Sequence, residues 1–346
     1  MPLDRAGAAA LGISLIIAAC GQVSPSLPPA SATSTAASSD AAASPAASPS
    51  PSVAVKPTGT PLASPNAVAI RVAPSDILLP SGRSRAVALV FGSTILLSGG
   101  LTQAGTTGSI TRIDLPSRRV STVGALAAPV HDAGGAVLGG SGFIFGGGRF
   151  GPGSVVQSVD PTGRSIIVGQ LPAIRADLSA VAVDGQLVLV GGGTSSGPDD
   201  RVLATTDGRH FWTMAKLIVG VRYPALAVIG GVVYVIGGST PSGDTRVIQA
   251  LDPRTGVVRI VGRLTHGLSH ASALVVGGDL LVAGGRVAGR IQDDLWQLDV
   301  ASGTVALVGR LPYAVSDAAV AVVDGTGYLI GGEGPDALAT IVMVTR

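Results

Sequence analysis

From residue 82 onward, short apolar runs alternate with turns rich in glycine, aspartate and proline. Residues 178–183 (LSAVAV) and 186–190 (QLVLV) have the pattern of two strands joined by the tight turn Asp184-Gly185. Residues 246–251 and 257–261 have the same pattern around an Asp-Pro turn. These runs are too short for helices, and they lack the 3.6-residue periodicity of an amphipathic helix. The pattern therefore predicts an all-β domain of short antiparallel strands.

Pairs of glycines divide this region into six units. The spacing between the first glycines of successive pairs is 47, 45, 46, 47 and 47 residues. A fixed period of this length holds four short strands and indicates a repeat fold. The six pairs are Gly99-Gly100, Gly146-Gly147, Gly191-Gly192, Gly237-Gly238, Gly284-Gly285 and Gly331-Gly332.

Three features recur with the same period: the glycine pair after an apolar strand, an Asp-Pro turn such as Asp160-Pro161, and a Leu-Pro exit such as Leu171-Pro172. In these features residues 82–346 resemble kelch repeats. The resemblance implies six four-stranded antiparallel blades around a central channel, a kelch-like β-propeller. The aromatic residue that kelch repeats carry in the fourth strand occurs once, as Trp212, whereas Trp296 falls in a third strand.

The sixth unit has three predicted strands before the chain ends at Arg346. Residues 68–74 (VAIRVAP) precede the first unit and have the character of a strand. We expect this N-terminal strand to become the outer strand of the last blade, because an unpaired strand edge promotes aggregation.

The first 66 residues have a different composition. Residues 1–19 contain Arg5 and then an apolar stretch that is short for a membrane span, as in a signal peptide. The stretch ends in Ile17-Ala18-Ala19-Cys20, which resembles the bacterial lipobox and implies cleavage before Cys20 and lipidation of its sulfur. Residues 20–66 are rich in Pro, Ala and Ser, and we expect a disordered linker. The propeller is expected at 67–346.

Charge and cysteine content narrow the partners. The net charge is +2, only 13 % of the residues are charged, and basic residues form no cluster, which disfavours nucleic acid. Cys20 is the one cysteine, so no disulfide can form within the chain. We expect a monomer on the outer, extracytoplasmic face of the bacterial cell membrane, held there by its lipid anchor.

A polar position recurs fourteen residues before each glycine pair, where the innermost strand begins. Equivalent positions in a propeller form a ring, so these residues are expected at the mouth of the channel. Residues just after the glycines add three charges to the same face. Two interpretations remain open: strand starts near water are polar in any case, or the ring is a pocket for a polar ligand. The candidate ligand-binding residues are Arg85, Asp132, Asp177, Tyr223, His270 and Asp317, with Arg149, Arg286 and Glu333, and His131, Arg222 and Tyr313 lie alongside in the sequence.

The favoured function is a non-catalytic scaffold that binds a glycan, a peptide or an envelope protein. The alternative is a carbohydrate-active envelope enzyme of the mutarotase or lyase type, which rests on fold analogy. Galactose oxidase resembles kelch propellers, but its copper site needs a cysteine that this domain lacks. The segment Thr205–Trp212 resembles a sialidase Asp-box, which is a turn without catalytic residues. We expect no cofactor, no metal site and no catalytic residue.

Overall fold

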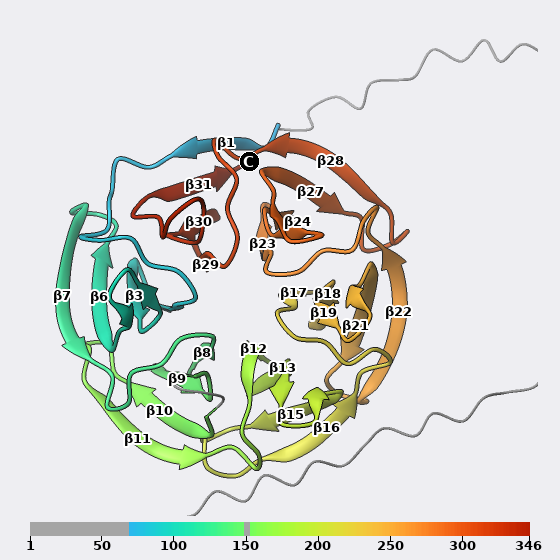
Figure 1. The fold of residues 1–346 in the computed structure, drawn as a ribbon, viewed down its shortest axis with the longest axis horizontal. Coiled ribbons are helices and arrows are strands. Elements are labelled where there is room, and N and C mark those ends of the chain that lie inside the picture. The colour runs from blue at the N-terminus through green and yellow to red at the C-terminus, as the bar shows by residue number, and fades with distance from the viewer. Residues whose placement is uncertain (1–68, 149–152) are drawn as a thin grey trace, which may run out of the picture. The chain divides into compact units, whose positions relative to one another are not determined.

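Six antiparallel sheets surround a central channel in the computed structural model, which describes residues 69–148 and 153–346 (Figure 1). The predicted signal peptide, Cys20 and the linker lie outside the described residues. The described residues form one compact unit. The inner strands of all six sheets line the channel, and no described residue is helical. The predicted all-β, six-bladed propeller is confirmed.

Each of the first five blades has four strands that run outward from the channel in chain order. Blade 1 contains β2 (Val87–Phe91), β3 (Thr94–Ser98), β6 (Ser109–Asp114) and β7 (Arg119–Ala125). Blade 2 contains β8 (Gly134–Leu138), β9 (Ser141–Phe145), β10 (Val155–Val159) and β11 (Ser165–Gln170). Blade 3 contains β12 (Ala176–Val183), β13 (Gln186–Thr194), β15 (Arg201–Thr205) and β16 (Trp212–Lys216). Blade 4 contains β17 (Ala225–Ile229), β18 (Val232–Ile236), β21 (Val247–Asp252) and β22 (Val257–Arg263). Blade 5 contains β23 (Ser272–Val276), β24 (Asp279–Ala283), β27 (Asp294–Leu298) and β28 (Val305–Arg310).

Blade 6 joins the two ends of the domain. Its inner strands are β29 (Ala319–Val323), β30 (Thr326–Ile330) and β31 (Ile341–Thr345), and its outer strand is β1 (Arg71–Pro74). The register pairs Arg71 with Thr345 and Pro74 with Val342. The predicted closure by the N-terminal strand is therefore confirmed.

Short hairpins extend from the second strand of several blades, on the face where the glycine pairs lie. Three are separate two-stranded pairs, and in blade 3 a short strand pairs with the extended β13. They are β4 (Leu101–Thr102) with β5 (Gly105–Thr106), β14 (Gly197–Pro198) with β13, β19 (Ser239–Thr240) with β20 (Gly243–Asp244), and β25 (Arg286–Val287) with β26 (Arg290–Ile291).

The glycine pairs connect each blade to the next. In all six pairs the second glycine donates its N–H to a carbonyl of the following blade, as Gly238 does to Leu268 at 2.7 Å. The first glycine leaves no room for a side chain: a Cβ on Gly237 would lie 2.2 Å from the Leu268 carbonyl oxygen, and its φ is +61°. Only glycine tolerates both demands without strain, which explains why the pair recurs in every unit.

The hydrophobic core is divided among the six seams between neighbouring blades. Each seam contains one cluster of buried aliphatic residues from both blades. Between blades 4 and 5, for example, Ile236 and Ile248 pack against Leu268 and Val282. Each blade is therefore buried on both of its faces, against the preceding blade on one side and the following blade on the other.

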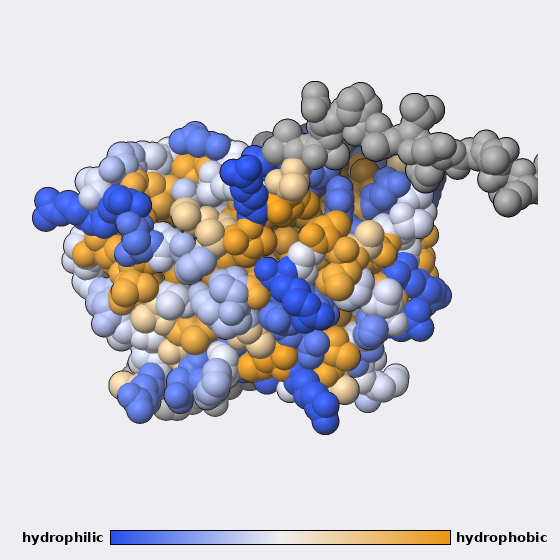
Figure 2. All heavy atoms as spheres, turned by 90° about the horizontal axis from the view of Figure 1, so that it is seen from above, coloured by the Kyte–Doolittle hydropathy of each residue, from blue (hydrophilic) through white to orange (hydrophobic). Residues whose placement is uncertain are grey.

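The rim of the propeller is less apolar. Its outer strands expose single hydrophobic residues such as Ile167, Ile260 and Leu307, and Trp212 is 43 % exposed at the start of β16. Figure 2 shows hydrophobic residues interspersed with hydrophilic ones on the side of the molecule that it presents. Within the described residues, no helix has the length and hydrophobicity to cross a membrane.

Candidate functional site

Six candidate residues meet at one end of the channel, as the repeat predicted. All six line one small cavity there; five precede the inner strand of their blade, and Asp177 is the second residue of β12. Each has a left-handed backbone with φ between 52° and 62°, a conformation that costs a non-glycine residue energy. We call Arg85, Asp132, Asp177, Tyr223, His270 and Asp317 the mouth ring.

The backbone of the mouth ring forms a closed circle of hydrogen bonds. Each ring residue donates its N–H to the carbonyl of the ring residue in the preceding blade, at 2.8 to 3.2 Å. The last bond runs from Arg85 in blade 1 to Asp317 in blade 6 and completes the circle. The left-handed φ turns every N–H toward its neighbour, so this conformation repeats although none of the six residues is glycine.

The charged side chains pair with one another across blades 1, 2, 5 and 6. Arg85 contacts Asp132 at 3.0 Å and Glu333 at 2.7 Å. Arg286 also pairs with Glu333 and lies 3.4 Å from Asp317. Glu333 therefore connects the two arginines, and the network contains two guanidinium and three carboxylate groups.

The other ring residues form a second group. His270 Nδ1 lies 2.6 Å from Asp317 Oδ1. The imidazole stacks on the Tyr223 ring with 3.7 Å between centroids. Arg222 pairs with Asp177 and lies 5.3 Å from the centre of the Tyr223 ring. Aromatic stacking and ion pairing thus occupy this half of the mouth.

Burial and ion pairing shift the pKa values of the charged mouth residues in opposite directions. Burial raises the pKa of Asp132 to about 6, and it outweighs the nearby Arg85 charge. Burial opposes the charge of Arg85, but the hydrogen bond to Glu333 and the neighbouring carboxylates raise its pKa above the usual value. For Asp317, burial is likewise outweighed, and the hydrogen bond from His270 holds its pKa below the usual range. Burial and nearby carboxylates raise the pKa of Tyr223.

The residues flanking the ring differ in where they lie. The residue before each ring position pairs in an isolated bridge with the residue after the glycine pair in five of the six units, as Ser316 does with Glu333. This bridge brings Arg286 and Glu333 to the mouth. His131 lies 3.6 Å from Asp132, whereas Tyr313 donates to Thr340 at 2.5 Å and does not join the ring contacts. Arg149 lies outside the described residues.

Sequence reasoning missed two serines of the network. Ser84 donates to Glu333 at 3.1 Å, and Ser316 accepts from Arg286 at 3.1 Å and donates to Asp317 at 2.9 Å. The sequence signal that could have identified them is their position: like His131 and Arg222, each serine immediately precedes a ring residue. A lone serine is too common for that position to have indicated a role.

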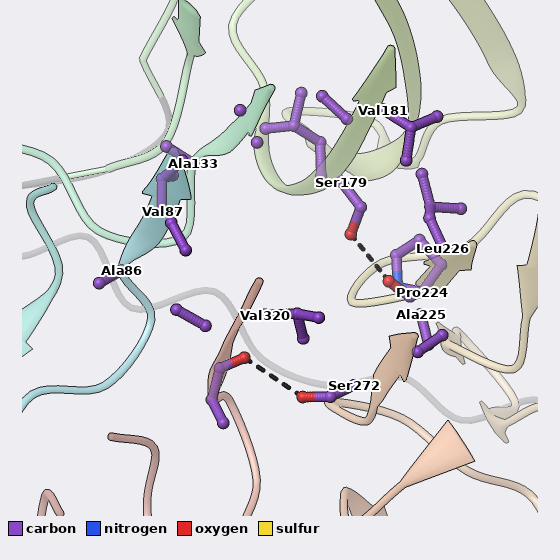
Figure 3. Close-up of a pocket in the computed structure, with 18 of the residues that line it drawn as sticks. Ala86, Val87, Ala133, Ser179, Val181, Pro224, Ala225, Leu226, Ser272 and Val320 are labelled. Carbon is purple, nitrogen blue, oxygen red and sulfur yellow. Dashed lines mark hydrogen bonds between the residues drawn. The ribbon is translucent and has the colours of Figure 1, made fainter. Parts of the chain in front are cut away.

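The channel below the ring is narrow and is lined mainly by small side chains. It contains a cavity of about 120 Å³ under the ring and one of about 180 Å³ among the inner strands. Figure 3 shows the second cavity, where Ser179 donates to the Pro224 carbonyl at 2.8 Å. Ser272 donates to the Ala318 carbonyl at 3.3 Å, so both hydroxyls are satisfied by backbone. Ligand pockets usually measure ~300–1,000 Å³, so these two cavities are too small for a sugar or a peptide. A cavity of about 510 Å³ lies farther along the inner strands, among Val90, Val137 and Val228.

A larger cavity lies beside the mouth, between blades 6 and 1. It measures about 880 Å³, and its wall includes Ser84, Thr102, Glu333 and Asp336. Glu333 therefore belongs both to the ion-pair network and to an open cavity of ligand size. Its side chain is 20 % exposed, and that of Arg286 is 25 % exposed.

Radial four-stranded sheets, closed by the N-terminal strand, define a six-bladed β-propeller. The Kelch motif family model matches residues 221–265, which span the strands of blade 4. No curated protein matches the chain. Since the other units repeat the glycine pairs of the matched one, the protein is a kelch-repeat propeller, a fold consistent with a binding scaffold.

Proposed function

We propose that this protein is a non-catalytic binding propeller, held on the outer face of the bacterial membrane by a lipid on Cys20. The lipobox-like sequence before Cys20 and the Pro, Ala and Ser-rich segment after it support the anchor. The kelch propeller fold supports the binding role, because its blades present loops from six units around one mouth. The ligand is polar, a glycan or a peptide segment.

One observation carries the binding role: the mouth network borders the 880 Å³ cavity through Glu333. A ligand carboxylate or hydroxyl in that cavity takes over hydrogen bonds that Glu333 makes with Arg85 and Arg286. A ligand ammonium or hydroxyl group donates to Glu333 itself. Mixed charges at the cavity wall thus favour a ligand that carries both donors and acceptors, and they disfavour a simple ion.

One contact favours the alternative enzyme. The short bond from His270 to Asp317 is the arrangement that orients an imidazole as a general base. However, the imidazole stacks on Tyr223 and the cavity beneath it measures about 120 Å³, too small for a sugar. We therefore prefer binding, and a test of turnover accompanies the test of binding.

The binding test uses the full-length chain on an array of glycans and peptides. Glu333→Gln keeps the shape of the side chain but removes its charge, so affinity for any peptide or charged glycan that binds should fall by about tenfold or more. Arg254→Gln is the control, because Arg254 is exposed in the turn between β21 and β22. Equal binding by all three proteins would overturn the mouth as the binding site. Chemical conversion of a bound sugar, lost in His270→Ala, would instead establish the enzyme.

The anchor is tested by labelling cells with a radioactive fatty acid. The wild-type chain should carry the label and fractionate with membranes, and Cys20→Ser should carry none. A labelled Cys20→Ser protein, or an unlabelled wild type, would contradict the proposal.

A further inference from the structure

One position of the third strand fastens the loop that enters its blade. In blade 2, Gln157 accepts from the N–H of Ala128 and donates to its carbonyl, both at 2.8 Å. In blade 4, Gln249 accepts from the N–H groups of Ile218 and Val219 and donates to the Val219 carbonyl at 3.0 Å. In each case one amide side chain bridges the seam to the preceding blade.

Trp296 occupies this position in blade 5. It pairs with Val282 as Gln249 pairs with Val235. An indole has one N–H donor and no acceptor, so it cannot make the double bridge. The corresponding loop, residues 264–268, lines a cavity of about 500 Å³ together with Trp296. The double bridge is therefore absent here, as it is where Thr111, Leu203 and Val342 occupy this position, but only in blade 5 is the residue aromatic.

The hairpin beside this cavity also departs from the repeat. In the blade 1 and blade 4 hairpins a threonine hydroxyl donates to a glycine carbonyl, as Thr240 does to Gly243 at 2.8 Å. In blade 5, Val287 replaces the threonine, and Ala288 has a left-handed φ of 49°. Val287 and Ala288 both line the cavity. Two independent changes thus fall on the same seam.

The cavity wall combines an aromatic face with polar groups of both signs. Trp296 is partly buried in the seam cluster, whereas His266 and Arg290 are exposed at the entrance. Asp294 Oδ1 is buried and has no hydrogen-bond partner among the described residues. It lies 3.2 Å from Arg310, close enough for charge attraction but without hydrogen-bond geometry. The Asp294 side chain as a whole is 20 % exposed and lines the cavity, so its accessible part offers an acceptor to a ligand.

We propose that this cavity, the Trp296 pocket, is a binding site for one or two neutral sugar residues of a glycan. The apolar face of a pyranose packs on an indole, and its hydroxyls both donate and accept, as Asp294, Arg290 and Gln292 require. One carboxylate and one guanidinium leave the lining without net charge, which disfavours an anion or a cation. The volume is in the range of small-ligand sites. The pocket is separate from the mouth and does not depend on the function proposed for it.

The chain offers its own reporter, because its two tryptophans are Trp212 and Trp296. In full-length Trp212→Phe, fluorescence comes from Trp296 alone. Cellobiose, chitobiose and lactose serve as neutral probes, with trilysine and glucuronate as charged ones. At least one neutral probe should change the emission in a saturable way, with a dissociation constant of about 1 mM or lower.

The matched variant is Trp296→Gln, which restores the amide of blades 2 and 4 and so favours an intact fold. Calorimetry on this variant should show affinity reduced by at least about tenfold. Arg290→Ala, on the exposed end of the hairpin, should weaken binding while leaving the circular dichroism spectrum unchanged. Glu333→Gln should bind the neutral probe as the wild type does.

Three results would overturn the proposal. One is the absence of saturable binding of every neutral probe to the wild type. The second is tighter binding of trilysine or glucuronate than of any disaccharide. The third is equal loss of binding in Glu333→Gln and Trp296→Gln, which would assign the glycan to the mouth.

Discussion

The seam between blades 6 and 1 is closed by chain that precedes the first blade, and this closure can be tested with one residue. Leu79 is 6 % exposed and packs in the seam cluster with Ile77, Ile95 and Ile330. Its N–H also donates to the Ala339 carbonyl at 2.8 Å. Truncation of a buried leucine to alanine removes transfer free energy and leaves a cavity. We therefore expect Leu79→Ala to lower the free energy of unfolding by ~2–5 kcal/mol.

The adjacent residue supplies the control. Leu78 has the same side chain but is 57 % exposed, so Leu78→Ala should change the free energy of unfolding by less than ~0.5 kcal/mol. Urea unfolding, followed by circular dichroism, measures both variants on the same scale. Deletion of residues 67–80 should destabilise at least as much as Leu79→Ala, and deletion of 23–60 should not. Equal midpoints for Leu78→Ala and Leu79→Ala would refute closure by this segment.

Three further predictions concern single side chains. Asp132 has a pKa of about 6 in place of 3.8, so its stabilisation is complete below pH 3.8 and is lost as the pH rises through 6. Relative to Asp132→Asn, the wild type should lose ~1.4 kcal/mol per pH unit across that window, and parallel pH profiles of the two would contradict this. Gly237→Ala places a Cβ against a backbone carbonyl and should cost ~2–4 kcal/mol, whereas Gly230→Ala, with φ +60° and open space, should cost ~1–2 kcal/mol. A calorimetric melt showing equal losses would count against the steric argument. Arg175 is 1 % exposed and pairs with Asp199, which also contacts Arg201 at 2.9 Å. Arg175→Met removes one of the two partners of this carboxylate and should lower the free energy of unfolding by ~1–3 kcal/mol; an unchanged urea midpoint would be inconsistent with that pairing.

The sequence was informative wherever one physical demand recurs in every unit. The glycine pair is such a demand, since a carbonyl of the next blade touches it each time. The closing strand was predictable from the number of strands in each unit. The sixth unit has three predicted strands, so its blade needed one more, and the N-terminal strand supplies it. The position of the mouth ring followed from the period. Its residues were placed correctly because equivalent positions in a propeller are related by rotation about the channel.

Pairing among side chains could not be predicted in the same way. Glu333 joins Arg85 and Arg286 because the isolated bridge beside each blade brings the residue after the glycines to the mouth. That bridge has no sequence signal of its own. The Trp296 pocket was equally hidden, because it depends on what Gln249 does at another seam. Trp296 was noticed as an aromatic residue in an unexpected strand, but its consequence appears only when the seams are compared.

The residue types of the mouth ring indicate that their side chains matter. A left-handed φ is easiest for glycine, and any other residue loses ~1–2 kcal/mol there. This chain contains 50 glycines, yet the six ring positions have arginine, aspartate, tyrosine and histidine. The backbone circle alone would form as well with glycine, because only N–H and carbonyl groups take part in it. A role of the side chains therefore explains why these strained positions are not glycine. For Asp132 and Asp317, the ion pairs with the arginines are such a role. The ion pairs do not require Arg85, Arg286 and Glu333 to be partly exposed beside a cavity. A ligand in that cavity would contact the exposed parts of these side chains.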